Sequence, residues 1–525
     1  MTQERGMARG DDASIIVLDK FVQATRDSGY KGTTSAVSEI VDNSLQAGAK
    51  NIWITISNSG DDHHPLVLAV LDDGGGMDRR TLRQALRFGG SSRFNDRVGM
   101  GRFGMGLPNS SLSQARRLEV FSWQKKAQTI FSYLDVDEIA AGELTVVPDP
   151  ISEKLPPQTV DMIPNTGTLV VWSKCDRLSH SRISTITKKL RRGLGQVFRH
   201  YIWNGVTITI NGEDVKPLDP LFLKGVNAAE GTVVFGEPMT YEITLPPVNG
   251  AKPKTAHLTV TFTELPVHDL HRLSNEEKRE RGISNGAGIS VVRAGREVDF
   301  GWFLMGTKRK ENYDDWWRAE VAFDPDLDEL FGVTHTKQQI RPQEYLTDIL
   351  VPDMEAMAKA LNSRVRQAHL RLKAGEATKA AEETAASRES LLEPLPKNHA
   401  EVQDNAAVKA LLKQHPALKK PPENDVTFDY RIVEADVKDS SFYSCIVTNG
   451  HFVLAINPDH PFFRRVYKPL SDLDTAEAKQ ARTHIELLLI AAARAEASGT
   501  RAGDRRAVAE NRQRWSDILA TFLNR

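Results

Sequence analysis

A glycine-rich segment at residues 98–106, VGMGRFGMG, is the feature that most constrains how this chain can fold. Its glycines are Gly99, Gly101, Gly104 and Gly106. Because glycine has no side chain, these residues leave the backbone of a loop exposed just before a segment of helical pattern. Backbone N–H groups and a helix N-terminus can then face phosphate groups. The loop is not a dinucleotide-binding fingerprint, because it does not follow the first strand of a parallel βαβ unit. It is not a Walker A loop either, because no Gly-Lys-Ser/Thr ends it.

A predicted helix at about 34–47 carries two polar residues that could act together. Its apolar residues recur at helical spacing. Glu39 and Asn43 lie four residues apart, so both side chains leave one face of the helix. A carboxylate in this position can orient a water molecule, and an amide can coordinate Mg²⁺. Two polar residues on a helix are also typical of a solvated face, so the pair alone does not decide the function.

An acidic, glycine-rich turn follows the next two predicted strands. Residues 51–56 alternate as in a half-buried strand, and the apolar run 66–71 leads into Asp72-Asp73-Gly74-Gly75-Gly76-Met77. A buried Asp72 carboxylate could accept a hydrogen bond from an adenine amino group, and the glycines would let the base approach. Asp-Gly is also common in β-turns. Further along, Thr168 opens another strand pattern, TLVVW.

The joint occurrence of these four segments, in this order, resembles the nucleotide boxes of the GHKL ATPases. This group includes gyrase B, the large heat-shock chaperone, histidine kinases and MutL. The resemblance implies an α/β sandwich, the Bergerat fold, with helices stacked on one face of a sheet. It also implies an ATPase that binds ATP together with Mg²⁺.

The resemblance assigns roles to individual residues. Glu39 becomes the general base and Asn43 the Mg²⁺ ligand. Asp72 becomes the acceptor for adenine, with Thr168 beside it. The remaining nucleotide contacts fall on the loop residues Gly74, Gly76 and Met77 and on the glycine-rich box at the lid, Gly99, Gly101, Gly104 and Gly106.

A second region extends the resemblance to about residue 345. HTKQQ, residues 335–339, resembles the transducer loop of gyrase B, MutL and MORC-type ATPases, which makes Lys337 the candidate for contacting the γ-phosphate. A surface lysine would fit the same sequence. GISVVRAGREV, residues 288–298, resembles a transducer strand of MORC-like and MutL-like proteins. Unlike eukaryotic MORC proteins, this sequence has no zinc-binding CW module and no long coiled coil.

We therefore expect an α+β chain of several domains. The prediction is a GHKL ATP-binding domain at 1–178, a ribosomal-protein-like α/β transducer domain at 179–373, a partly helical linker at 374–425, and a small α+β module of unknown role at 426–525. Within this last module, Asn449-Gly450 between two apolar runs predicts a β-hairpin. Helical patterns at about 476–497 and 506–523 end the sequence.

Three classes of function remain open for such an ATPase. An ATP-gated homodimeric clamp acting on DNA is favoured by the transducer-like region and by a basic run, KKLRRGLGQVFRH, at 188–200, although that run also suits a solvated helix. A heat-shock-type chaperone is the alternative. A histidine kinase needs a phosphoacceptor helix ahead of the ATP site, for which about 30 residues leave little room.

The overall composition gives weaker indications. The formal net charge is -1, which gives the surface no general bias toward nucleic acid. The polar N-terminal sequence, the lack of a long apolar run and a total of two cysteines favour a cytoplasmic protein without a membrane segment. In the family, N-terminal segments and the lid make intersubunit contacts when ATP is bound. The short apolar run at 14–18 could therefore pair with a partner's sheet or with its own.

Overall fold

The computed structural model describes residues 17–30, 32–90, 106–125, 128–156, 163–245, 253–284, 286–334, 339–395, 405–419, 421–422, 428–435, 437, 440–473, 475–499 and 502–524. The chain divides into two compact units, one within residues 1–363 and one within 364–525.

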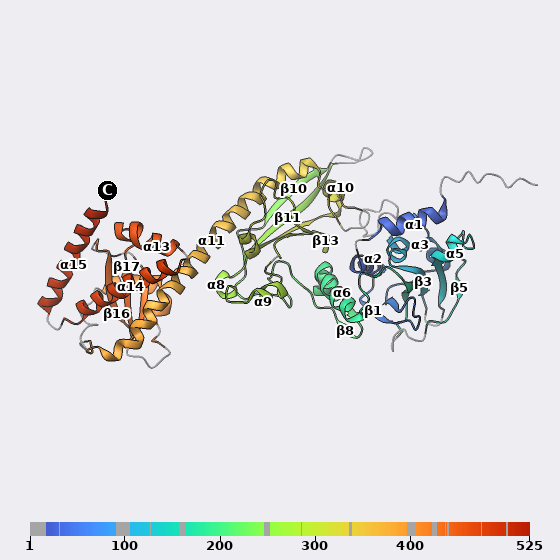
Figure 1. Cartoon of the computed structure of the whole chain (residues 1–525). Coiled ribbons are helices and arrows are strands. Elements are labelled where there is room, and N and C mark those ends of the chain that lie inside the picture. The colour runs from blue at the N-terminus through green and yellow to red at the C-terminus, as the bar shows by residue number, and fades with distance from the viewer. Residues whose placement is uncertain are drawn as a thin grey trace, which may run out of the picture. The chain divides into compact units, whose positions relative to one another are not determined.

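The first unit opens with a sheet whose described strands follow the order β5-β4-β3-β6-β2-β1-β7-β8 (Figure 1). The strands are β1 Asn51–Asn58, β2 Leu66–Asp72, β3 Ala115–Trp123, β4 Ile130–Asp135, β5 Ile151–Ser152, β6 Gly167–Cys175, β7 Thr207–Ile210 and β8 Glu213–Asp214. Paired strands run antiparallel, except that β7 lies parallel to β1.

Helices cover one face of this sheet. They are α1 Leu18–Ser28, α2 Thr33–Gln46, α3 Arg79–Ala85, α4 Gly106–Leu112, α5 Val136–Ala140, α6 Ile183–Val197 and α7 Arg199–Trp203. Their apolar residues join the inward side chains of the strands in one buried cluster, which includes Val37, Leu112, Leu190, Ile54 and Val170. The opposite face carries a smaller cluster around Trp123. This layering is the α/β sandwich expected from the sequence.

The sheet extends beyond the boundary expected at residue 178. Helix α6 packs into the same core through Ile186 and Leu190, and β7 pairs with β1 from Asn51↔Thr207 to Ile54↔Ile210. Residues 183–214 therefore complete the first sheet. The sequence had placed them in the second domain, because a strand that pairs with a partner about 155 positions away leaves no local signal.

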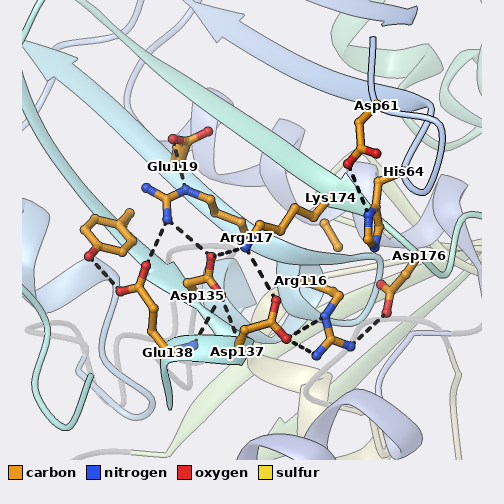
Figure 2. A network of polar contacts seen from close by, with 12 residues as sticks. Asp61, His64, Arg116, Arg117, Glu119, Asp135, Asp137, Glu138, Lys174 and Asp176 are labelled. Atoms are coloured by element: carbon orange, nitrogen blue, oxygen red, sulfur yellow. Dashed lines mark hydrogen bonds and ion pairs between the residues drawn. The ribbon is translucent and has the colours of Figure 1, made fainter. Parts of the chain in front are cut away.

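An ionic network ties β3, β4 and the end of β6 together (Figure 2). The Asp135 carboxylate is fully buried, accepts a hydrogen bond from the N–H of Asp137 at the start of α5, and pairs with Arg117 at 3.2 Å and Lys174 at 2.9 Å. Burial acts to raise the pKa of Asp135, but the hydrogen bonds from Lys174, Asp137 and Arg117 outweigh it and hold that pKa below its usual value. Asp137 also pairs with Arg116.

A second sheet follows in the same unit. Its order is β10-β11-β14-β12-β13, with β9 paired to β11. The elements are β9 Val233–Val234, β10 Met239–Leu245, β11 Lys254–Glu264, α8 Val267–Leu270, α9 Asn275–Glu280, β12 Ile289–Arg293, β13 Arg296–Gly301, β14 Trp317–Phe323 and α10 Asp328–Phe331. The N-terminal part of the long helix α11 (Glu344–Arg388) lies alongside this sheet (Figure 1), and its Leu346, Leu350 and Met354 enter the core of the sheet.

The second unit, within residues 364–525, combines a small sheet with helices. Its three-stranded sheet has the order β15-β17-β16. The elements are α12 Asn405–Gln414, β15 Asp429–Glu434, β16 Tyr443–Thr448, β17 His451–Ile456, α13 Lys468–Asp472, α14 Ala476–Ala497 and α15 Ala502–Leu523. The predicted hairpin joins β16 to β17, with positive φ at both Asn449 (49°) and Gly450 (81°).

The segment expected to be a partly helical linker, 374–425, contains helix and also packs into the core of the second unit. Helix α11 continues to Arg388, and its Ala381 belongs to the core of the second unit. Glu382 accepts a hydrogen bond from the N–H of Ile432 at 2.8 Å, and Glu389 pairs with Arg494. The Ala- and Glu-rich composition that favoured a linker is here the composition of a helix with a buried side.

In the part of the chain that the structure describes, no helix combines the length and the apolar character needed to cross a bilayer.

Candidate functional site

Helix α2 brings the first two candidate residues to the site. Its buried side, which includes Val37, Ile40 and Val41, fixes the helix against the sheet. Glu39 is only 4% exposed, whereas Asn43, one turn further, is partly exposed. The carboxylate and the amide therefore occupy one side of a helix whose orientation the core determines.

Asp72 ends β2 as a buried carboxylate, 5% exposed. Its Oδ2 accepts a hydrogen bond from Ser44 Oγ at 2.8 Å, and its Oδ1 accepts from the N–H groups of Gly74 at 2.9 Å and Thr168 at 3.2 Å. Burial raises the pKa of Asp72, although all three hydrogen bonds favour the ionised form. A carboxylate offers about four acceptor positions, so one is left on Oδ2 for a ligand.

Thr168 lies directly opposite Asp72 in the pairing of β2 with β6. Its Oγ1 is 3.0 Å from Ser122 Oγ on β3, and Ser122 Oγ also accepts a hydrogen bond from the N–H of Met77 at 2.8 Å. Three neighbouring strands thus hold the loop after Asp72 in place. The structure brings together Asp72, Met77 and Thr168, three of the residues that the sequence singled out.

Two loop glycines sit where a side chain has no room. A Cβ added at Gly74 would lie 2.8 Å from Ala47 Cβ and 3.0 Å from Asp72 Oδ1. Gly76 has φ +66°, and a Cβ there would lie 2.1 Å from the carbonyl oxygen of Trp123. The loop therefore depends on glycine both for its conformation and for its close approach to β3.

Gly106, the first residue of α4, packs against Glu39. A Cβ added at Gly106 would lie 2.1 Å from Glu39 Oε1 and 2.8 Å from its Cδ. The last glycine of the glycine-rich box thus lies in contact with the proposed base. Gly99, Gly101, Gly104 and Lys337 lie outside the described residues, so their assignments stay predictions.

The residues present fit a purine nucleotide and a divalent cation. The buried Asp72 carboxylate keeps one acceptor position for an amino group, and the glycines after it hold its loop in close contact with Ala47 and Trp123. Asn43 supplies an amide oxygen and Glu39 a carboxylate, which are ligand types that Mg²⁺ accepts. We found no dedicated cage of three or more His, Cys, Asp or Glu residues among the described residues. A cation held mainly by substrate phosphates needs no such cage.

Sequence reasoning missed three residues of this site. Ser44 and Ser122 bind the Asp72 carboxylate and its surrounding loop, but serines on a helix or strand carry no distinctive pattern. Tyr30 precedes α2, and the pKa of its hydroxyl is raised by burial and then by the nearby charges of Glu39 and Asp42. Only its position directly ahead of α2, the helix that carries Glu39 and Asn43, could have drawn notice.

Part of this chain is similar to known proteins. Residues 30–166 match the model of the family described as histidine kinase-, DNA gyrase B-, and HSP90-like ATPase. The chain is 31% identical over 115 residues to protein MICRORCHIDIA 5 of Arabidopsis thaliana, which covers 21% of this chain and 16% of that protein. It is 32% identical over 106 residues to MICRORCHIDIA 6 of the same plant, which covers 20% of this chain and 16% of that protein.

A third relative, MICRORCHIDIA 2 of Arabidopsis thaliana, is 28% identical over 173 residues, covering 30% of this chain and 27% of that protein. The aligned regions thus span from about a sixth to about a quarter of these relatives. For this N-terminal part of the chain, the comparisons confirm the resemblance to a GHKL ATPase of the MORC type.

Proposed function

We propose that this protein binds Mg-ATP and hydrolyses it. The observation that carries the proposal is the arrangement around Asp72, a buried carboxylate with an open acceptor position, followed by two glycines that let the loop pack closely against Ala47 and Trp123. The match of residues 30–166 to an ATPase family supports it. Asp72, Gly74, Gly76, Met77 and Thr168 form the adenine end of the site in this reading.

The residues of α2 serve the phosphate end. Asn43 would hold Mg²⁺ together with phosphate oxygens, and bound Mg²⁺ supplies charge neutralisation for the phosphoryl group. Glu39 orients the attacking water and accepts its proton. Lys337 and the backbone amides of Gly99, Gly101, Gly104 and Gly106 stabilise the charge on the γ-phosphoryl group. Positioning and electrostatics thus account for the catalysis, as is typical of phosphoryl transfer.

The cycle that hydrolysis drives is proposed to be ATP-gated dimerisation of a clamp that acts on DNA. The resemblance to clamp-forming ATPases suggests this role, and α6 supports it with three exposed cationic residues, Lys188, Lys189 and Arg192. The rest of the basic run is engaged within the protein: Arg191 pairs with Glu213, and Arg199 is buried against Glu297 and Glu320. The available positive surface is therefore smaller than the sequence run implies.

The macromolecule on which the ATPase acts is identified from the ATP turnover rate of the full chain. The rate is measured for the protein alone and with duplex DNA, single-stranded DNA or an unfolded protein. Stimulation by DNA supports the clamp, whereas stimulation by unfolded protein alone would favour a chaperone. Replacement of Lys188 and Lys189 by Gln should remove the DNA response and leave the basal rate unchanged. Lys224, an exposed residue outside α6, serves as the control position.

The dimer is tested separately with Glu39→Ala, which should bind ATP without hydrolysing it. Light scattering should give twice the monomer mass with Mg-ATP and the monomer mass without nucleotide. A mass that is the same in both conditions would contradict the ATP gate. Deletion of residues 1–18 should abolish the dimer if the apolar run at 14–18 is exchanged between subunits. Residues 14–16 lie outside the described part, and Leu18 begins α1.

A further inference from the structure

The turn between β12 and β13 reaches from the second sheet to the ATP-site helix. Ala294 and Gly295 form this turn with φ values of +47° and +82°. The next residue, Arg296, places its Nε 3.0 Å and 3.1 Å from the two carboxylate oxygens of Asp42 on α2. The Arg296 side chain is 5% exposed and that of Asp42 is 0% exposed, so water screens this ion pair very little.

Asp42 lies between the two functional residues of α2. It follows Glu39 by three positions and immediately precedes Asn43, so it belongs to the same helical turn. A shift of the Asp42 carboxylate therefore moves the backbone that carries both the proposed base and the proposed Mg²⁺ ligand. Neither Asp42 nor Arg296 has a place in the ATPase roles described above.

The neighbouring residue of β13 makes a second buried contact, with the charges reversed. Glu297 pairs with Arg199 at 2.8 Å and accepts a hydrogen bond from Gln196 on α6 at 2.6 Å. Helix α6 in turn touches α2, since a Cβ added at Gly193 would lie 2.4 Å from Thr34 Cγ2. One strand of the second sheet thus holds α2 directly and also through α6.

Two buried ion pairs of opposite polarity make this junction specific. Loss of one partner removes an opposite charge from beside a buried group, so the hairpin cannot leave α2 at low cost. A rotation of the second sheet must either carry α2 with it or break the Arg296–Asp42 pair. The junction therefore has the properties of a mechanical link between the second sheet and the phosphate end of the ATP site.

We propose that Arg296 is a positioning residue for ATP hydrolysis, which holds α2 through Asp42 so that Glu39 and Asn43 are aligned with the phosphates. The inference rests on the proposed ATPase function. It goes beyond that function by naming the contact through which the second sheet regulates turnover. Lys337 is proposed above to contact the γ-phosphate, whereas Arg296 fixes the helix that carries Glu39 and Asn43.

The test compares full-length Arg296→Met, Arg296→Lys and Asp42→Asn with a matched control, Arg293→Met. Arg293 lies on the same hairpin and forms a largely buried pair with Asp328 at 2.6 Å, with side chains 7% and 13% exposed, but that pair lies within the region of the second sheet. For Arg296→Met we expect kcat to fall about 10- to 100-fold, the cost of a small misplacement, while KM for ATP changes little. Arg296→Lys should recover part of kcat.

The kcat of the double variant Asp42→Asn with Arg296→Met should be no lower than that of the less active single variant, because the double variant removes both charges of the pair together. Hydrogen exchange of the α2 amides should accelerate in Arg296→Met and stay unchanged in Arg293→Met. An unchanged kcat in Arg296→Met, or an equal loss in Arg293→Met, would overturn the inference. If the unmodified protein shows no ATP turnover, the proposed function fails, and the exchange rates still decide whether Arg296 fixes α2.

Discussion

Replacing Asp72 by Asn tests the adenine end of the site most directly. The amide oxygen of Asn can keep the two N–H donors of Gly74 and Thr168, because both bind the same oxygen, Oδ1. The amide nitrogen must then take the place of Oδ2, where Ser44 Oγ can rotate from donor to acceptor. The fold should therefore survive, and the energetic cost of burying the charge disappears.

The ligand, in contrast, loses its acceptor. The open acceptor position on Oδ2 becomes an N–H group that faces the adenine amino group, and two donors then meet. A hydrogen bond to a charged group contributes about 1.5–3 kcal/mol. Its loss should weaken ATP binding by about 10- to 150-fold. Equilibrium titration with Mg-ATP in the Glu39→Ala background, where turnover does not disturb the measurement, gives this value.

Asp73→Asn is the matched control for this measurement. Asp73 is the adjacent carboxylate in the same turn, but it accepts hydrogen bonds from the backbone N–H groups of Lys50 and Asn51 at 2.8 Å and 2.9 Å. We expect a modest loss of stability and an unchanged Kd for ATP. An Asp72→Asn affinity within about twofold of the original, less than 0.5 kcal/mol, would refute the assignment. An equal loss in both variants would also refute it.

Three further predictions concern the phosphate end and acid stability. Glu39→Ala should retain ATP binding while turnover falls about 10²- to 10⁴-fold in single-turnover assays, and Asn43→Ala should weaken binding only when Mg²⁺ is present. Gly106→Ala should slow turnover by about 10²-fold because its Cβ would displace the Glu39 carboxylate, while the Kd for ATP measures whether the adenine end is intact. Asp135 has a lowered pKa in the folded protein, so its ionised form stabilises the fold above the unfolded pKa of about 3.9, and this contribution is lost as pH falls through the folded pKa. Thermal unfolding of Asp135→Asn should therefore change less between pH 7 and pH 3 than that of the original protein; a parallel decrease would contradict this.

Local patterns predicted much of the first sheet and its site. Helix α2, the turn after Asp72 and the hairpin at Asn449-Gly450 each depend on residues close in sequence, and the structure has all three. The register that sets Thr168 opposite Asp72 had to come from the family resemblance, because strand pairing over such a separation has no local signature.

What the sequence did not predict depends on contacts between distant segments. Ser44 and Ser122 gain their roles only when three strands and a helix meet. Arg296 and Asp42 are 254 positions apart, and each is an ordinary charged residue in its own segment. The predicted boundary of the first sheet at residue 178 was wrong for the same reason, because β7 pairs with β1 although α6 and many other residues separate the two strands in sequence.

Because β7 belongs to the first sheet but lies after residue 200, it determines where the chain can be truncated without damage to that sheet. A fragment that ends at residue 178 keeps every nucleotide box of the first sheet, yet it loses the strand that pairs with β1. Strand β1 would then expose a row of unpaired N–H and C=O groups, and part of the core beneath α6 would meet water. An uncovered edge of this kind is a template for intermolecular pairing. Such a fragment should precipitate or form oligomers of no fixed size, and light scattering could not distinguish these from an ATP-gated dimer. A fragment that continues through β8 keeps β7 paired with the edge of β1.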